Sequence, residues 1–106
     1  TGVYDFGVQS GLSNRPRFLG AAGNERPASP IDNIEGRPPP FLLAYGDLDF
    51  PHLMKQAERM EAALRAAGGD VERLVLKGRN HFTASYAGGE AGGPWVPAVL
   101  AWMLRR

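Results

Sequence analysis

Two short apolar segments separated by a helical pattern constrain the fold of this chain more than any other feature. The segments are residues 41–44 and 71–76, and apolar residues between 53 and 67 recur in steps of four and three. That spacing predicts one apolar face of an α-helix, with Pro51 in its first turn and Gly68-Gly69 at its end. Because parallel strands need a crossover connection, the sequence predicts a right-handed strand–helix–strand unit in an α/β fold.

Length and composition exclude several classes of function. At 106 residues the chain is one domain or part of one, and 12 Lys and Arg against 11 Asp and Glu leave no basic excess for nucleic acid. No segment approaches the roughly 18 apolar residues of a membrane span. The chain has no cysteine, which excludes disulfides, thiolate nucleophiles and cysteine zinc sites. The compartment stays open, although the cytoplasm is slightly favoured.

The composition changes near residue 40. Residues 1–40 hold six of the nine prolines, so we expect a loop-rich excursion, lid or pocket segment, followed by a strand–helix–strand–helix unit over 41–106. Four apolar residues in the first part are candidates for lining an acyl or aromatic substrate pocket, and core packing is an equal alternative for them: Tyr4, Phe6, Phe18 and Leu19.

A carboxylate and an imidazole follow the two predicted strands. Tyr45-Gly46-Asp47-Leu48-Asp49 comes directly after the first strand, and Gly78-Arg79-Asn80-His81-Phe82 forms the loop after the second. In open parallel sheets, ligands and chemistry gather at the carboxyl ends of the strands. We therefore expect Asp49 and His81 to meet at one edge of the sheet.

These segments together resemble the C-terminal part of an α/β-hydrolase of the esterase/lipase branch, which includes carboxylesterases and arylformamidase-like enzymes. The resemblance rests on Ser29-Pro30-Ile31, on residues 39–49, on the helix over 56–68 and on residues 76–82, and it extends to the opening residues 1–6. It implies a sheet completed by further strands and a hydrolase acting on carboxylic esters or amides, with no cofactor or metal.

The resemblance also implies roles for two residues. Asp49 would be the triad acid and His81 the triad base, while the serine nucleophile would precede both in the chain. None of Ser10, Ser13, Ser29 and Ser85 stands in a Gly-x-Ser-x-Gly elbow, and the oxyanion-hole loop of the His-Gly-Gly type is missing. We therefore expect an N-terminal portion, in a separate chain or in residues outside this sequence, to carry the nucleophile.

Other interpretations of the same residues stay open. Asp49 at a helix start could accept backbone N–H groups, and Asp47 reads as a turn residue. His81 could be a structural histidine, and His52 reads as a surface or pocket-rim residue. A zinc site built from both histidines and a carboxylate has no paired ligand spacing to support it.

Two alternatives exist for the chain as a whole. It could be a non-catalytic α/β interaction module or a degenerate hydrolase fragment, because it lacks the nucleophile motif. A nucleotide-binding α/β domain is disfavoured, since the loop after the first strand would bring the carboxylates of Asp47 and Asp49 to the phosphates.

Overall fold

The computed structural model describes residues 2–7, 18–20 and 23–106 of the chain. The elements run in the order α1 (Glu25–Ala28), η2 (Pro30–Asp32), β1 (Phe41–Gly46), α2 (Pro51–Ala66), β2 (Val71–Leu76), α3 (His81–Tyr86), η3 (Ala87–Gly89) and α4 (Trp95–Leu104). None of the helices in these residues has the length and apolar character that a bilayer crossing requires.

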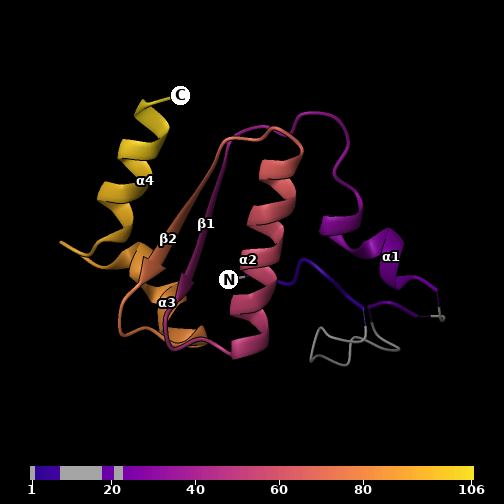
Figure 1. Ribbon diagram of the computed structural model, residues 1–106. Helices are drawn as coiled ribbons and strands as arrows, with labels where there is room; N and C mark the ends of the chain where they lie inside the picture. The colour runs from indigo at the N-terminus through magenta and orange to yellow at the C-terminus, as the bar shows by residue number, and fades with distance from the viewer. Residues whose placement is uncertain (1, 8–17, 21–22) are drawn as a thin grey trace.

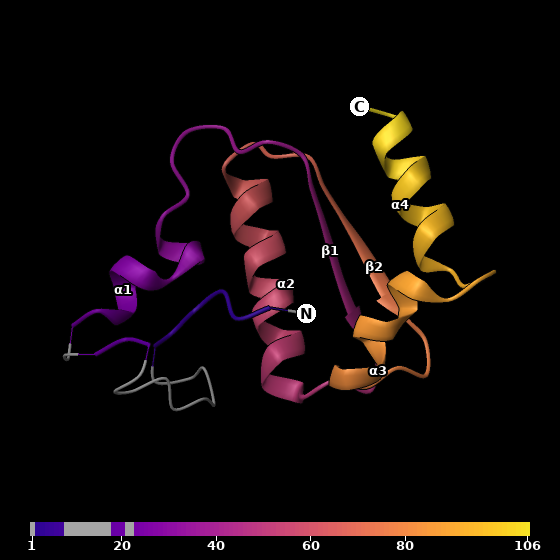
Figure 2. The same ribbon diagram turned by 180° about the vertical axis from the view of Figure 1, so that it is seen from behind.

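Strands β1 and β2 pair in parallel, with Phe41 opposite Val71 and Gly46 opposite Leu76. Helix α2 makes the crossover between them, and it begins at Pro51 as the sequence predicts. Helices α2 and α4 lie on opposite sides of the strand pair, and α3 lies at the arrowheads of both strands (Figures 1 and 2). The predicted α/β class is confirmed, and the arrangement is that of the C-terminal part of an α/β-hydrolase sheet.

The core lies between α2 and the strands. It is formed by Leu43, Met60, Leu64 and Val71, of which Met60 and Leu64 lie on the apolar face that the spacing predicts. Three partly buried residues of the loop-rich N-terminal part pack against this core: Tyr4, Ile31 and Ile34. These three residues thus contribute packing surface to the sheet domain, and burial raises the pKa of Tyr4.

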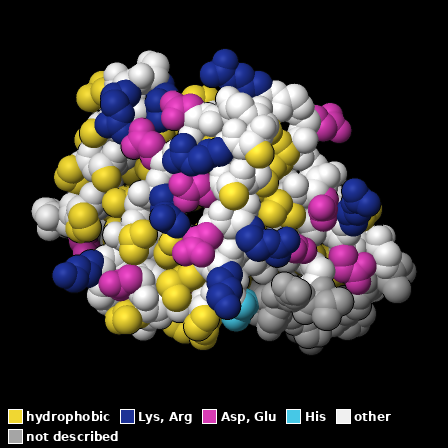
Figure 3. Space-filling view, viewed as in Figure 1, with side chains coloured by type: hydrophobic (Ala, Val, Ile, Leu, Met, Phe, Trp, Pro, Cys, Tyr) yellow, Lys and Arg dark blue, Asp and Glu magenta, His cyan; other side chains and the backbone are white. Residues whose placement is uncertain are grey.

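Charged side chains attach the end of α4 to the start of β2. Arg105 donates to Glu72 at 2.6 Å, and Arg106 donates to Asp70 at 2.6 Å. The hydrogen bond from Arg105 holds the pKa of the Glu72 carboxyl below its usual value. Elsewhere, acidic and basic side chains are interspersed over the face seen in Figure 3.

Helix α3 occupies a segment that the sequence pattern treats as loop. Its start is fixed by a capping box, in which the Asn80 side chain accepts from the backbone N–H groups of Phe82 and Thr83 while Thr83 Oγ1 accepts from Asn80 N. The capping box thereby supplies acceptors for two backbone N–H groups of the first turn, which have no hydrogen-bond partner within the helix. As a result His81 stands at the first helical position and not in an irregular loop.

Candidate active site

The structure brings Asp49 and His81 together at the carboxyl end of the strand pair. Asp49 lies in the β1–α2 connection and His81 begins α3, and Asp49 Oδ1 lies 3.0 Å from His81 Nδ1. The Asp49 side chain is fully buried, whereas that of His81 is 36% exposed. The carboxylate is therefore inside the molecule and the imidazole reaches its surface.

The carboxylate oxygen that faces His81 has a second donor. The backbone N–H of Phe50 donates to the same Asp49 Oδ1 at 2.7 Å. An ionised carboxylate only accepts hydrogen bonds, so the contact requires the proton on His81 Nδ1. Nε2 of the neutral ring is then an acceptor, which is the protonation state that a general base needs.

Backbone contacts hold the two loops against one another. Leu48 N donates to the Arg79 carbonyl oxygen at 3.0 Å, and a Cβ built on Gly46 would collide with that same carbonyl group. Only glycine allows such a close backbone approach. Asp47 adds a side-chain link, because its Oδ1 accepts from Gly78 N at 2.7 Å. The carboxylate of Asp47 thus joins the loops, as a turn residue would, while that of Asp49 faces the imidazole.

The second loop is also tied to the segment that follows α3. Arg79 forms a bidentate ion pair with Glu90, with Nη1 to Oε1 at 2.7 Å and Nη2 to Oε2 at 2.5 Å. A bidentate arginine–carboxylate pair fixes orientation as well as distance. The residues on either side of His81 are therefore held both by the capping box and by this pair.

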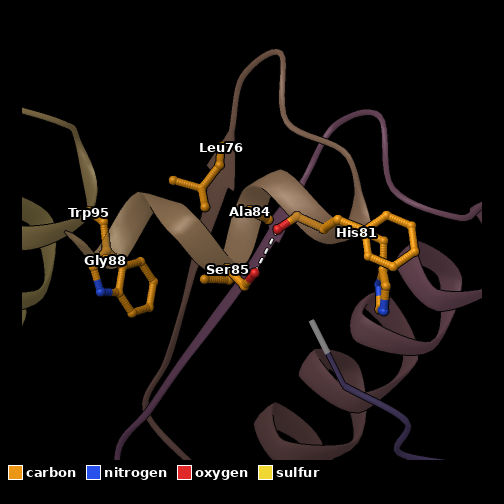
Figure 4. Close-up of a pocket in the computed structure, with 8 residues that line it drawn as sticks. Leu76, His81, Ala84, Ser85, Gly88 and Trp95 are labelled. Atoms are coloured by element: carbon orange, nitrogen blue, oxygen red, sulfur yellow. Dashed lines mark hydrogen bonds between the residues drawn. The ribbon is translucent and has the colours of Figure 1, made fainter. Parts of the chain in front are cut away.

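An open pocket of about 420 Å³ lies beside His81. Figure 4 shows its lining residues, with His81 and Trp95 at opposite ends and Ala84 and Ser85 of α3 between them. Ser85 lines the same pocket, but its hydroxyl donates to the Phe82 carbonyl oxygen at 2.6 Å. Ser29 is buried and bonds to Phe6 N and to the Glu25 carbonyl. Both described serines thus have backbone partners, and neither hydroxyl contacts His81.

The four predicted pocket residues separate into different environments. Leu19 is buried, and Tyr4 packs against the core. Phe6 and Phe18 pair with ring centroids 5.1 Å apart. Within the described residues none of these rings contacts His81. Their role in substrate binding stays a prediction.

His52 lies at the start of α2, where its ring stacks on Phe50 with centroids 5.8 Å apart. Its Nε2 is buried and has no hydrogen-bond partner among the described residues. No group of three His, Cys, Asp or Glu side chains in the described part of the chain could hold a metal ion.

Residues 21–106 match the model of the prolyl oligopeptidase family. The match supports the α/β-hydrolase superfamily, but it does not support the esterase/lipase branch that the motifs resemble. The resemblance to that branch rests on short segments of sequence, including those around Asp49 and His81. No curated protein and no solved structure matches the chain significantly.

Proposed function

The chain belongs to the prolyl oligopeptidase family, whose members have the α/β-hydrolase fold, and from this membership we propose that it carries the acid and the base of a serine hydrolase. His81 is the general base and Asp49 is the residue that orients it. The nucleophilic serine comes from an N-terminal portion, either in the same polypeptide or in a companion chain. The proposal is supported above all by the 3.0 Å contact between Asp49 and His81.

The geometry suits a two-step acyl transfer. His81 Nε2 takes the proton of the serine hydroxyl as the serine oxygen bonds to the substrate carbonyl carbon, and Asp49 stabilises the imidazolium. The imidazolium then returns the proton to the leaving amine or alcohol as the carbon–heteroatom bond breaks. Water repeats the same sequence on the acyl-enzyme, which releases the acid and restores the serine.

We propose amide bonds of peptides as the first substrate class, because the family is a peptidase family. Carboxylic esters are the second class, since they pass through the same acyl-enzyme and have the better leaving group. Tyr4, Phe6, Phe18 and Leu19 remain candidates for the pocket that holds the acyl group.

The test compares two histidines in the complete protein, with turnover of a peptide p-nitroanilide and a p-nitrophenyl ester as readouts. His81→Ala should abolish most turnover because no base remains to activate the serine. His52→Ala is the matched control and should change turnover little. The chain alone should show neither a burst nor labelling by a fluorophosphonate. Intact turnover in His81→Ala would contradict the proposal.

A second candidate is a non-catalytic interaction module. It is favoured by the missing Gly-x-Ser-x-Gly motif and by the backbone partners of Ser29 and Ser85. A complete protein that is folded but neither turns over these substrates nor reacts with a fluorophosphonate would support this second candidate.

A further inference from the structure

The ring of Phe50 contacts two imidazole rings at the candidate site. Its ring centroid is 5.3 Å from that of His81, at an interplanar angle of 42°, and 5.8 Å from that of His52, at 19°. The ring of Phe82 meets it edge-on at 6.4 Å. Although it takes part in these contacts, Phe50 is 45% exposed, so its ring forms part of the surface beside the catalytic imidazole.

The backbone of Phe50 is fixed on both sides. Its N–H donates to Asp49 Oδ1, and its carbonyl oxygen accepts from Leu53 N at 2.9 Å and from Met54 N at 3.1 Å. Pro51 follows directly and restricts the conformation of the residue before it. The aromatic ring therefore projects from a fixed point where the loop that carries Asp49 enters α2.

The His81 ring has one hydrogen bond, at Nδ1, among the described contacts. A single bond at one ring atom leaves the imidazole free to tilt about that atom, which would move Nε2 away from the serine. Phe50 and Phe82 contact the ring from two further directions, and Phe82 does so edge-on with centroids 5.4 Å apart. Aromatic pairs of this geometry are attractive beyond their buried area.

We infer that Phe50 is a positioning residue, which keeps the plane of the His81 imidazole in the orientation that aims Nε2 at the serine. The inference rests on the proposed function, in which His81 is the base. Phe50 itself exchanges no proton and forms no bond with substrate. Its contribution is to make one orientation of His81 dominant over others.

The experiment replaces the Phe50 ring in the complete protein and measures both turnover and His81 orientation. Phe50→Leu should lower kcat for p-nitrophenyl acetate by about 2- to 10-fold, the range expected for one lost aromatic contact, while KM stays unchanged. Phe50→Tyr keeps the ring and should retain the wild-type kcat. Tyr86→Leu is the matched control, because Tyr86 is a 65% exposed aromatic residue of α3 with no ring contact in the described part of the chain.

A second readout does not depend on turnover. In NMR spectra of protein labelled at histidine, the His81 ring protons should lose the ring-current shift from Phe50 and broaden in Phe50→Leu, but not in Tyr86→Leu. Unchanged kcat together with unchanged His81 ring signals in Phe50→Leu would overturn the inference alone. Intact turnover in His81→Ala would overturn the proposed function instead, so the two failures are distinguishable.

Discussion

Replacing Asp49 by Asn tests how the acid acts on His81, because one oxygen serves two donors. Asp49 Oδ1 accepts from Phe50 N at 2.7 Å and lies 3.0 Å from His81 Nδ1. An Asn that turned its NH₂ group to this position would place it against the Phe50 N–H, donor against donor. We therefore expect the carboxamide oxygen to stay there, so that the Nδ1–H tautomer of His81 survives while the negative charge is lost.

The lost charge sets the magnitude of the effect. A carboxylate and an imidazolium about 4 Å apart attract by about 4 kcal/mol at an effective dielectric constant of about 20. Removing that attraction from the transition state should lower kcat by about 10³-fold. A triad in which Asn also leaves the wrong tautomer loses about 10⁴. We therefore expect the smaller loss of kcat in Asp49→Asn, because the oxygen that accepts from both Phe50 and His81 keeps the tautomer of His81.

The assay is kcat for a peptide p-nitroanilide in the complete protein, combined with ¹⁵N chemical shifts that report the His81 tautomer. Asp49→Ala is the comparison variant, and it should lose more activity and also stability, because it leaves the Phe50 and His81 N–H groups without their acceptor. Asp49→Asn with more than about a tenth of wild-type kcat would refute the charge argument. A His81 shifted to the Nε2–H tautomer would refute the shared-oxygen argument.

Two further substitutions test the fold, one beside the site and one at the start of β2. Gly46→Ala should destabilise the complete protein by about 1–3 kcal/mol in denaturant unfolding, because the added methyl group meets the Arg79 carbonyl. Gly89→Ala, whose Cβ meets nothing within 4 Å, should stay within about 0.5 kcal/mol of wild type, and equal effects of the two would contradict the close approach. Glu72→Gln should lower Tm at neutral pH and not in acid. The reason is that the hydrogen bond from Arg105 lowers the pKa of Glu72 in the folded state, so the stabilisation is present above the unfolded pKa and is lost as pH falls through the lowered one. A Tm difference that persists in acid would contradict this.

The strand–helix–strand unit could be predicted because strong local signals agree with its tertiary contacts. The apolar steps between residues 53 and 67 match the buried face of α2, and Pro51 begins the helix as expected. The strand ends differ from the prediction: the apolar segment covers residues 41–44, whereas β1 runs over Phe41–Gly46. The last two residues of the strand, Tyr45 and Gly46, are set by pairing with β2, which local sequence does not encode.

The meeting of Asp49 and His81 followed from topology, but their surroundings did not. Helix α3 was missed because six residues carry too little periodicity, although Asn80 and Thr83 hold the capping-box signal. Phe50 belongs to no sequence motif, so its place at the site could not be predicted. Its contacts with His81 and Phe82 form only when the two loops come together in the fold. The family match does not support the esterase/lipase branch, because short motifs around a carboxylate and an imidazole do not distinguish one hydrolase branch from another.

Strand register has to be held more tightly here than packing alone requires. A slip of one residue between β1 and β2 would move one loop by about 3.3 Å along the strand, which is enough to break the Asp49–His81 contact. The core residues Leu43 and Val71 oppose such a slip only through the packing of their side chains. At the strand ends, the Leu48–Arg79 hydrogen bond, the Asp47–Gly78 hydrogen bond and the close approach at Gly46 each exist in one register alone. The geometry of the candidate site therefore depends on these loop contacts. Substitutions of the residues that form them should lower both activity and stability, whereas the same substitutions in an open loop should not lower stability.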